Sequence, residues 1–280
     1  MHFFTQLLTF GYRQALCCIF PVAIFLTLAA SKYLHIPYQY DVILVVCIGV
    51  QAILVYTGLE TVDELKVISL FHIIGLFLEL FKVHHGSWAY PEAAITKIAG
   101  VPVYSGFMYS SVASYICQAW KRFDLRFHNW PPGKITFTLA AIIYLNFFLH
   151  HYWADIRWII IASLFPIFRK SYVTFSVNKT IYRMNVITSY FLIGFFIWLA
   201  ENISTFFGAW QYPDQQMGWQ MVHLSKISSW FLLVIISIII VANLKHIKYP
   251  TEALRDENEE AEPTNVAAPA ALPVTGQEIT

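Results

Sequence analysis

The chain alternates between long apolar runs and short polar connections. Eight runs predict membrane-spanning helices, because a spanning helix needs about 20 mostly apolar residues. They cover residues 14–34, 40–58, 65–82, 99–119, 135–151, 153–169, 184–202 and 222–244. The sixth run is the weakest, since it is short, carries Asp155 and Arg157 near its start and has Pro166 near its end. A seven-helix alternative omits this run.

One polar pattern occurs twice, each time at the end of an apolar run. The first signature extends from Glu79 to Glu92 and the second signature from Glu201 to Asp214, and both read Glu-x6-Gly-x-Trp-x-Tyr-Pro-acid. Matched positions are separated by 122 residues. We interpret the pattern as an internal duplication whose copies face each other across a pseudo-two-fold axis.

The offset of 122 residues also bears on the number of helices. When the first, third and fourth runs are shifted by this offset, they coincide with the fifth, seventh and eighth runs. The second run then needs the sixth run as its counterpart. Because each half then has an even number of helices, both halves enter the membrane in the same direction. The sequence therefore predicts an all-α membrane bundle of about eight spans, built as two parallel four-helix repeats.

The expected organisation follows from this duplication and from shifts in composition. A polar, basic and proline-punctuated segment separates the two repeats, and the end of the chain is too rich in Glu, Ala and Pro to bury a core. The predicted parts are a first repeat over 1–120, a cytoplasmic linker over 121–134, a second repeat over 135–249 and a disordered tail over 250–280.

Composition strengthens the membrane interpretation. Hydrophobic residues make up 58% of the chain and charged residues only 12%, whereas an average soluble domain is roughly 25% charged. Such a chain cannot form a soluble surface of ordinary polarity, so the lipid bilayer is its expected partner. The basic residues are scattered over loops and give no nucleic-acid signal.

Lys and Arg predict the orientation in the membrane. Thirteen of the 18 lie at the N-terminus, in the even-numbered loops or after the eighth run, and 5 lie on the opposite side. Because cytoplasmic loops are enriched in Lys and Arg, both termini are expected in the cytoplasm. Both signatures then lie at the outer face.

Two carboxylates are the candidate catalytic residues. Glu79 and Glu201 lie near the outer ends of their helices, and a carboxylate in a membrane segment is costly unless it faces protein or water, so it is a functional candidate by default. A structural alternative stays open. Either glutamate can accept hydrogen bonds from backbone N–H groups of the following loop, where Gly86 or Gly208 allows a tight turn.

Aromatic, histidine and acidic residues around the signatures are candidates for binding a substrate. Histidines gather on the outer side, where with carboxylates they could relay protons. No recognised metal-ligand spacing is present, so no metal is predicted, and the sequence identifies no cofactor. The candidate substrate-binding residues are His72, His84, His85, Trp88, Tyr90, Glu92, Trp210, Tyr212 and Asp214.

The first signature, with the segment from Gly100 to Ser105 that follows it, resembles a bacterial membrane family catalogued as domain of unknown function 817. The resemblance is specific between Gly86 and Glu92 and covers most of the membrane portion. It implies a multi-pass protein of the bacterial cytoplasmic membrane and brings no established activity.

A more distant resemblance is to the heterodimeric lycopene cyclases and related carotenoid hydratases. Their repeated motif has an acid, then Gly-x-Trp, then Pro and an acidic pair, and the first part is similar to Glu79, Gly86 and Trp88. Tyr104 and Ser105 stand where the cyclases have the acidic pair. The resemblance implies a shared architecture without the cyclase acids.

Three functional classes follow from these observations. One is a membrane enzyme that acts on an isoprenoid or another lipid-soluble substrate with Glu79 or Glu201 as acid, and it predicts an apolar cavity reaching the signatures. A second is a small-solute permease, which predicts a polar path across the membrane. A third is a non-catalytic scaffold, which predicts tightly packed repeats.

Overall fold

The computed structural model describes residues 2–248, and the tail predicted over 250–280 lies outside the described residues. The chain divides into two units, Met1–Ala242 and Asn243–Thr280, and the first holds every site discussed below. Within residues 2–248 the protein is mostly helical, with nine α-helices, five short strands and one 3-10 helix.

The helices follow the predicted apolar runs. They are α1 (His2–Cys17), α2 (Ile19–Tyr33), α3 (Gln39–Tyr56), α4 (Val62–His84), α5 (Ser105–Phe123), α6 (Gly133–Leu149), α7 (Arg157–Phe168), α8 (Val186–Phe206) and α9 (Lys226–Lys248). The first predicted run is interrupted at Cys18, where α1 and α2 meet at a bend of 70°. The fourth begins later than predicted, because residues 97–102 form a small hairpin, β1 (Lys97–Ile98) and β2 (Val101–Pro102), before α5.

Fewer helices than predicted are long and apolar enough to cross a membrane on their own. Among the described residues α3, α4 and α8 qualify, and the bent pair α1–α2 adds a fourth if it forms one span. Helices α6 and α7 and the Lys226–Ala242 part of α9 are apolar but shorter. These helices are consistent with a membrane protein and account for three or four candidate spans of the eight predicted.

The described chain is mostly helical, as predicted, but the prediction of an all-α fold missed two small sheets. Strands β3 (Arg126–His128), β4 (Tyr172–Val177) and β5 (Thr180–Asn185) form an antiparallel sheet in the order β3-β4-β5. Strands β4 and β5 are joined at Asn178 and Lys179, both with positive φ, as a two-residue hairpin turn requires. The predicted linker thus contributes a strand, and the segment before α8 is a hairpin.

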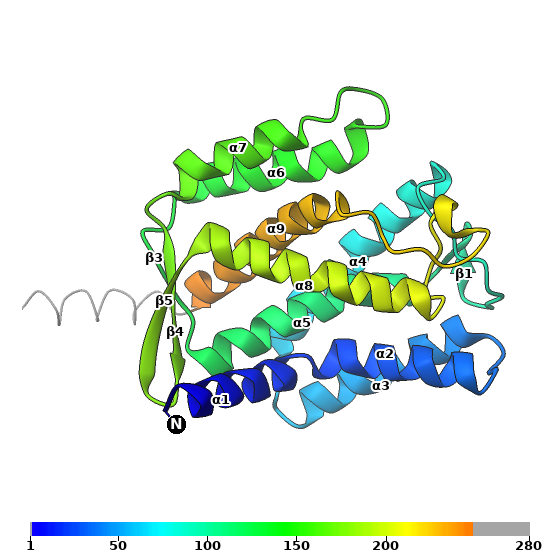
Figure 1. Cartoon of the computed structure of the whole chain (residues 1–280), viewed down its shortest axis with the longest axis horizontal. Helices are drawn as coiled ribbons and strands as arrows, with labels where there is room; N and C mark the ends of the chain where they lie inside the picture. Colours follow the sequence, from blue (N-terminus) through cyan, green and yellow to red (C-terminus); the bar gives the residue numbers. More distant parts are fainter. Residues whose placement is uncertain (1, 249–280) are drawn as a thin grey trace, which may run out of the picture. The chain divides into compact units, whose positions relative to one another are not determined.

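Within the first unit the two signatures and the sheet lie at opposite ends of the helices (Figure 1). The ends of α4 and α8 meet beside β1, whereas β3, β4 and β5 cover the other end. Helix α1 packs on the sheet, where the Arg13 guanidinium donates to the carbonyl oxygens of Arg122 and Ser176, both at 3.1 Å. The signatures are therefore held at one end, far from the sheet.

Apolar side chains form the interior and also cover the outside of the helices. One buried cluster joins α5 to α6, α7, α8 and α9, and a second joins α2 and α3 to the signature aromatics. Val45 on α3 is 69% exposed, Ile73 on α4 64% and Phe196 on α8 64%. Large apolar side chains facing outward are the expected surface of a helix that contacts lipid.

Candidate functional site

Glu79 is the hub of the first signature. It lies in the last two turns of α4 and is 3% exposed. One carboxylate oxygen, Oε2, accepts hydrogen bonds from the Trp88 indole N–H at 2.6 Å and the Tyr90 hydroxyl at 2.7 Å. The other, Oε1, accepts one from the Tyr109 hydroxyl of α5 at 2.8 Å. The carboxylate therefore ties the signature loop to two helices.

Glu201 has the same place in the second signature. It is also 3% exposed, and it accepts hydrogen bonds from the Tyr212 hydroxyl at 2.5 Å and the Trp230 indole N–H at 2.7 Å. The tyrosine is the counterpart of Tyr90, 122 residues later, whereas the indole comes from α9 rather than from the loop. Both carboxylates thus hold their own loop through a tyrosine.

The backbone turns of the two signatures match bond for bond. Gly86 and Gly208 have φ of 68° and 79°, a conformation that glycine adopts without strain. Two backbone hydrogen bonds close each helix end. In the first signature the N–H groups of Gly86 and Ser87 donate to the carbonyls of Val83 and Lys82, both at 3.0 Å. In the second, the N–H groups of Gly208 and Ala209 donate to the carbonyls of Thr205 and Ser204, at 3.1 and 2.9 Å. Such bonds satisfy the carbonyl groups left open at a helix end.

The two signatures are joined to each other directly. Ala89 and Gln211, which are 122 residues apart, form an antiparallel β-bridge in which each N–H donates to the other's carbonyl at 2.9 Å. Residues of the first half also hold the second turn. The Tyr104 hydroxyl donates to the Ala209 carbonyl, and the Gln39 amide to that of Gly208 at 3.1 Å. Tyr104 and Gln39 therefore brace the second turn from the first half of the chain.

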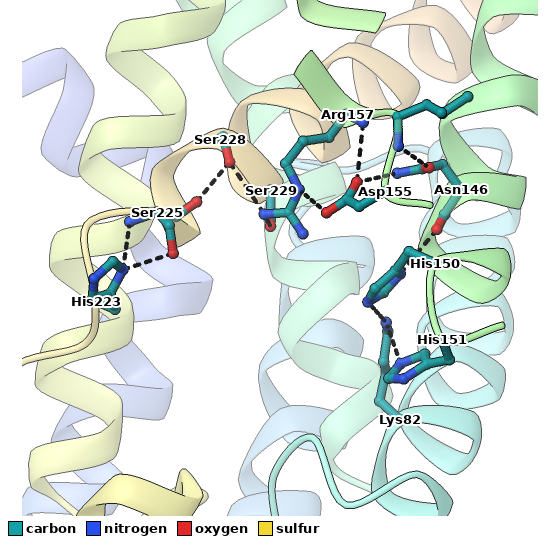
Figure 2. A network of polar contacts seen from close by, with 11 residues as sticks. Lys82, Asn146, His150, His151, Asp155, Arg157, His223, Ser225, Ser228 and Ser229 are labelled. Atoms are coloured by element: carbon teal, nitrogen blue, oxygen red, sulfur yellow. Dashed lines mark hydrogen bonds and ion pairs between the residues drawn. The ribbon is translucent and has the colours of Figure 1, made fainter. Parts of the chain in front are cut away.

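A second group of polar side chains lies beside the first signature (Figure 2). Lys82, in the last turn of α4, is 5% exposed, and its ammonium contacts Nε2 of His150 at 3.3 Å and of His151 at 3.0 Å. Nδ1 of His150 lies 2.9 Å from the Asn146 carbonyl. Since a carbonyl only accepts, Nδ1 carries the proton and Nε2 offers its lone pair to the ammonium.

The polar group continues towards α9 (Figure 2). The Asp155 carboxylate accepts from the Asn146 amide at 3.2 Å and from the Arg157 guanidinium at 2.6 Å. The same guanidinium donates to the hydroxyls of Ser228 and Ser229, at 3.3 and 3.2 Å. Contacts thus extend from α4 through the α6–α7 loop to the start of α9.

Protonation of the loop groups follows from burial and neighbouring charge. Burial, with the nearby Lys82 charge, lowers the pKa of His150 and lowers that of His151 to about 4, so both rings are neutral at neutral pH. Burial and then the charge of the nearby glutamates raise the pKa of Tyr90 and Tyr212 well above its usual range. Both hydroxyls therefore stay protonated and donate to their glutamates.

The structure separates the predicted site residues into two sets. Trp88, Tyr90 and Tyr212 contact the glutamates, and Trp210 is buried beside them. His85 contacts the Tyr152 hydroxyl at 2.8 Å, next to His151. Three residues lie apart from the glutamates on exposed positions: His84, Glu92 and Asp214.

His72 lies apart as well, two turns before Glu79 on α4. Its ring packs on Phe107 and against Gly106, where a Cβ would lie 2.6 Å from Nδ1. Among the described residues no group of three or more His, Cys, Asp or Glu could hold a metal ion.

Sequence reasoning missed several polar partners. Tyr109 and Trp230 bind the glutamates, but their counterparts at the offset are Phe231 and Met108, so the repeat gives no signal for them. Nothing in the sequence pattern marked Lys82 or Glu60 as buried.

Glu60 lies at the other end of α4 from the signatures and is 1% exposed. Its carboxylate accepts from the Gln51 amide at 2.6 Å and from the Ser114 hydroxyl of α5. Helix α5 thus contacts one buried carboxylate near each end, Glu79 through Tyr109 and Glu60 through Ser114. The series of hydroxyl residues in the fourth run is the sequence signal that could have found this arrangement.

Apolar helices of spanning length and polar contacts buried between them define a multi-helix protein consistent with insertion in a membrane. The family described as "Protein of unknown function (DUF817)" matches residues 6–238, and the chain belongs to that family. It is 54% identical over 257 residues to "Uncharacterized protein YoaT" of Bacillus subtilis (strain 168), which covers 90% of this chain and 97% of that protein. No solved structure matches the chain significantly.

Proposed function

We propose that the chain forms an eight-span protein built from two parallel four-helix repeats. The equivalent turns, the tyrosine bonds to Glu79 and Glu201, and the bridge between Ala89 and Gln211 support this duplication. A bridge between equivalent residues is what a two-fold axis through the signatures would produce. Helices too short for a typical bilayer, such as α7, would cross with thinning of the bilayer or tilt of their neighbours.

The proposed location is the bacterial cytoplasmic membrane, with both termini in the cytoplasm and the signatures outside. The sheet opposite the signatures carries Arg126, Lys179 and Arg183. Basic residues at that end favour the cytoplasmic side. The lipid bilayer is then the partner of the outward-facing apolar side chains.

The activity we propose is passage of a small water-soluble solute through the bundle. One observation carries it: the buried face of α5 is polar along its length. Side chains at relative positions i, i+4, i+5, i+9 and i+13 are at most 8% exposed, namely Ser105, Tyr109, Ser110, Ser114 and Gln118. Polar groups inside a membrane protein face the bundle interior or an aqueous path, and this series connects the level of Glu79 with that of Glu60.

Some buried polar atoms on or near α5 have no hydrogen-bond partner in the part of the chain that the structure describes. Seven buried side-chain polar atoms have no hydrogen-bond partner within the described residues. Three of them belong to Ser105 of α5, to His72, which packs against Gly106 of α5, and to Gln51, which bonds Glu60. A packed scaffold would satisfy or omit such groups, because an unpaired buried polar atom costs free energy. Water or a polar solute passing along α5 would pair with them.

The test is a swelling assay on proteoliposomes with glycerol, urea and ammonium acetate as probes. We expect faster swelling than in protein-free liposomes for at least one probe. The double variant S110V/S114V should slow swelling when equal amounts of folded protein are compared, whereas T27V, which removes a hydroxyl bonded only within α2, should swell as the parent does. Equal swelling with and without protein, or no effect of the double variant, would contradict a path along α5.

Acid catalysis by Glu79 or Glu201 on an isoprenoid or other lipid-soluble substrate stays a prediction. Both carboxylates are occupied by donors of the chain itself, so an acid role requires Tyr90 or Tyr212 to move aside first. The roles of His72, His84, His85 and the other predicted binding residues likewise stay predictions.

A further inference from the structure

Lys82 is a buried cation, and among the described residues no acidic side chain pairs with its charge. Its ammonium has three N–H donors, and its two partners, Nε2 of His150 and of His151, belong to neutral rings. Within residues 2–248 no carboxylate lies within ion-pair distance of this ammonium. A buried charge paired only with neutral groups is unfavourable, so an anion would stabilise it.

The charges around Lys82 strengthen this point. Arg157 and Lys226 lie close enough to repel the Lys82 charge, and Asp155 is the acid that attracts it. Asp155, however, is already bonded to Arg157 at 2.6 Å. Lys226 has its own compensation from Glu201 and Asp214. Among the residues that the structure describes, Lys82 is therefore the one of the three cations whose charge no carboxylate compensates.

The loop between α6 and α7 begins with the two histidines that contact Lys82. Tyr152 and Trp153 follow the two histidines and are 65% and 81% exposed. His85 and His151 have ring centroids 4.8 Å apart and extend the same rim. An anion that reached Lys82 from outside would pass this exposed segment of the chain.

We propose that Lys82, positioned by His150 and His151, binds an oxyanion group, a carboxylate or a phosphate, at the outer end of α4. The ammonium supplies the charge and its free N–H donor. Lysine is suited to this role because it binds phosphate as a compact point charge. The inference rests on the proposed function in one respect, since it names the class of solute that would enter the path.

Binding is measured without transport, so the two proposals can fail separately. The full chain in phosphatidylcholine nanodiscs is melted with increasing inorganic phosphate, acetate or, at equal ionic strength, chloride. We expect phosphate or acetate to raise the melting temperature in a saturable manner beyond chloride. K82M should need at least tenfold more anion for the same shift, and K32M, which changes an exposed lysine of the predicted outer side, should respond as the parent does.

A second variant and a second lipid complete the test. H151A removes one of the two imidazoles that hold the ammonium and should weaken the response, and it decides the matter if K82M does not fold. Nanodiscs with phosphatidylglycerol, in buffer without phosphate or acetate, test a lipid headgroup as the source. Stabilisation of the parent but not of H151A there supports the site with a lipid ligand. No response beyond chloride in any arm, or an unchanged response in folded K82M and H151A, overturns the proposal.

Discussion

At the scale of single residues, Glu79 and Glu201 organise their surroundings as acceptors. Five hydrogen bonds, three to the first and two to the second, come from tyrosine hydroxyls and indole N–H groups. The repeated spacing marked Trp88, Tyr90 and Tyr212 as candidate substrate-binding residues, and in the structure they donate to the carboxylates. It could not predict Tyr109 and Trp230, since their positions are not repeated and depend on how α5 and α9 pack.

Substitution of Glu79 separates bracing from acid chemistry. In E79A, three buried donors lose their acceptor, at roughly 1–3 kcal/mol for each donor left unpaired, so the melting temperature should fall by several degrees. E79Q keeps an oxygen for Trp88 and Tyr90, while its amide can donate to the Tyr109 hydroxyl, so a small change is expected. Thermal melts of both variants, with E201A and E201Q as the matched pair, check this. Full stability of E79Q with complete loss of swelling activity would instead indicate a required proton.

His151 makes stability depend on pH in a defined direction. Its pKa is lowered to about 4 by burial and by Lys82, His150 and His85, whereas an unfolded histidine titrates near 6.5. Between these values the unfolded state binds more protons, so stability should decrease as the pH falls from about 6.5 to about 4. Melting temperatures of the parent and of H151N across this range test it. The parent should lose more than H151N, and parallel curves would contradict the assignment.

At the scale of elements, α4 and α5 pack closely because small residues face large ones. A Cβ on Gly75 would lie 2.4 Å from the Tyr109 ring, which is too close for any real contact. Each of the eight apolar runs overlaps a helix, because long apolar runs are a strong signal, but residues 2–13 of α1 precede the first run and were not predicted. The β4–β5 hairpin was missed, since six-residue strands do not register in a search for long runs, and Asn178 with Lys179 lacks the glycine common in such turns.

The variant G75A tests the packing of α4 on α5. The added methyl group must displace Tyr109 and weaken its bond to Glu79, at a cost of roughly 1–3 kcal/mol for overpacking. G49A is the matched control, because nothing lies within 4 Å of a Cβ at Gly49 on α3. G49A should melt like the parent or slightly higher and G75A clearly lower. Equal melting temperatures would show that the contact does not stabilise the bundle.

At the scale of the whole molecule, the first unit has buried carboxylates near both ends of its helices. The carboxylates Glu79 and Glu201 belong to the two signatures, whereas Glu60 lies just before the other end of α4. The sheet lies at the end of the helices opposite the signatures (Figure 1). The sequence predicted that the signatures come together, because the offset implied symmetry. It could not predict Glu60 as a partner of α5, since one buried glutamate outside the repeat has no pattern to mark it.

The central claim is that both signatures lie on the outer face of the same membrane, as two parallel repeats require. It is tested by labelling intact cells with a membrane-impermeant maleimide, after replacing Cys17, Cys18, Cys47 and Cys117. Single cysteines go at Glu92 and Asp214, exposed in the two signatures, and at Lys179, exposed in the sheet turn. E92C and D214C should both react in intact cells, and K179C only after the cells are permeabilised. Reaction of E92C and D214C from opposite sides would contradict the parallel repeats.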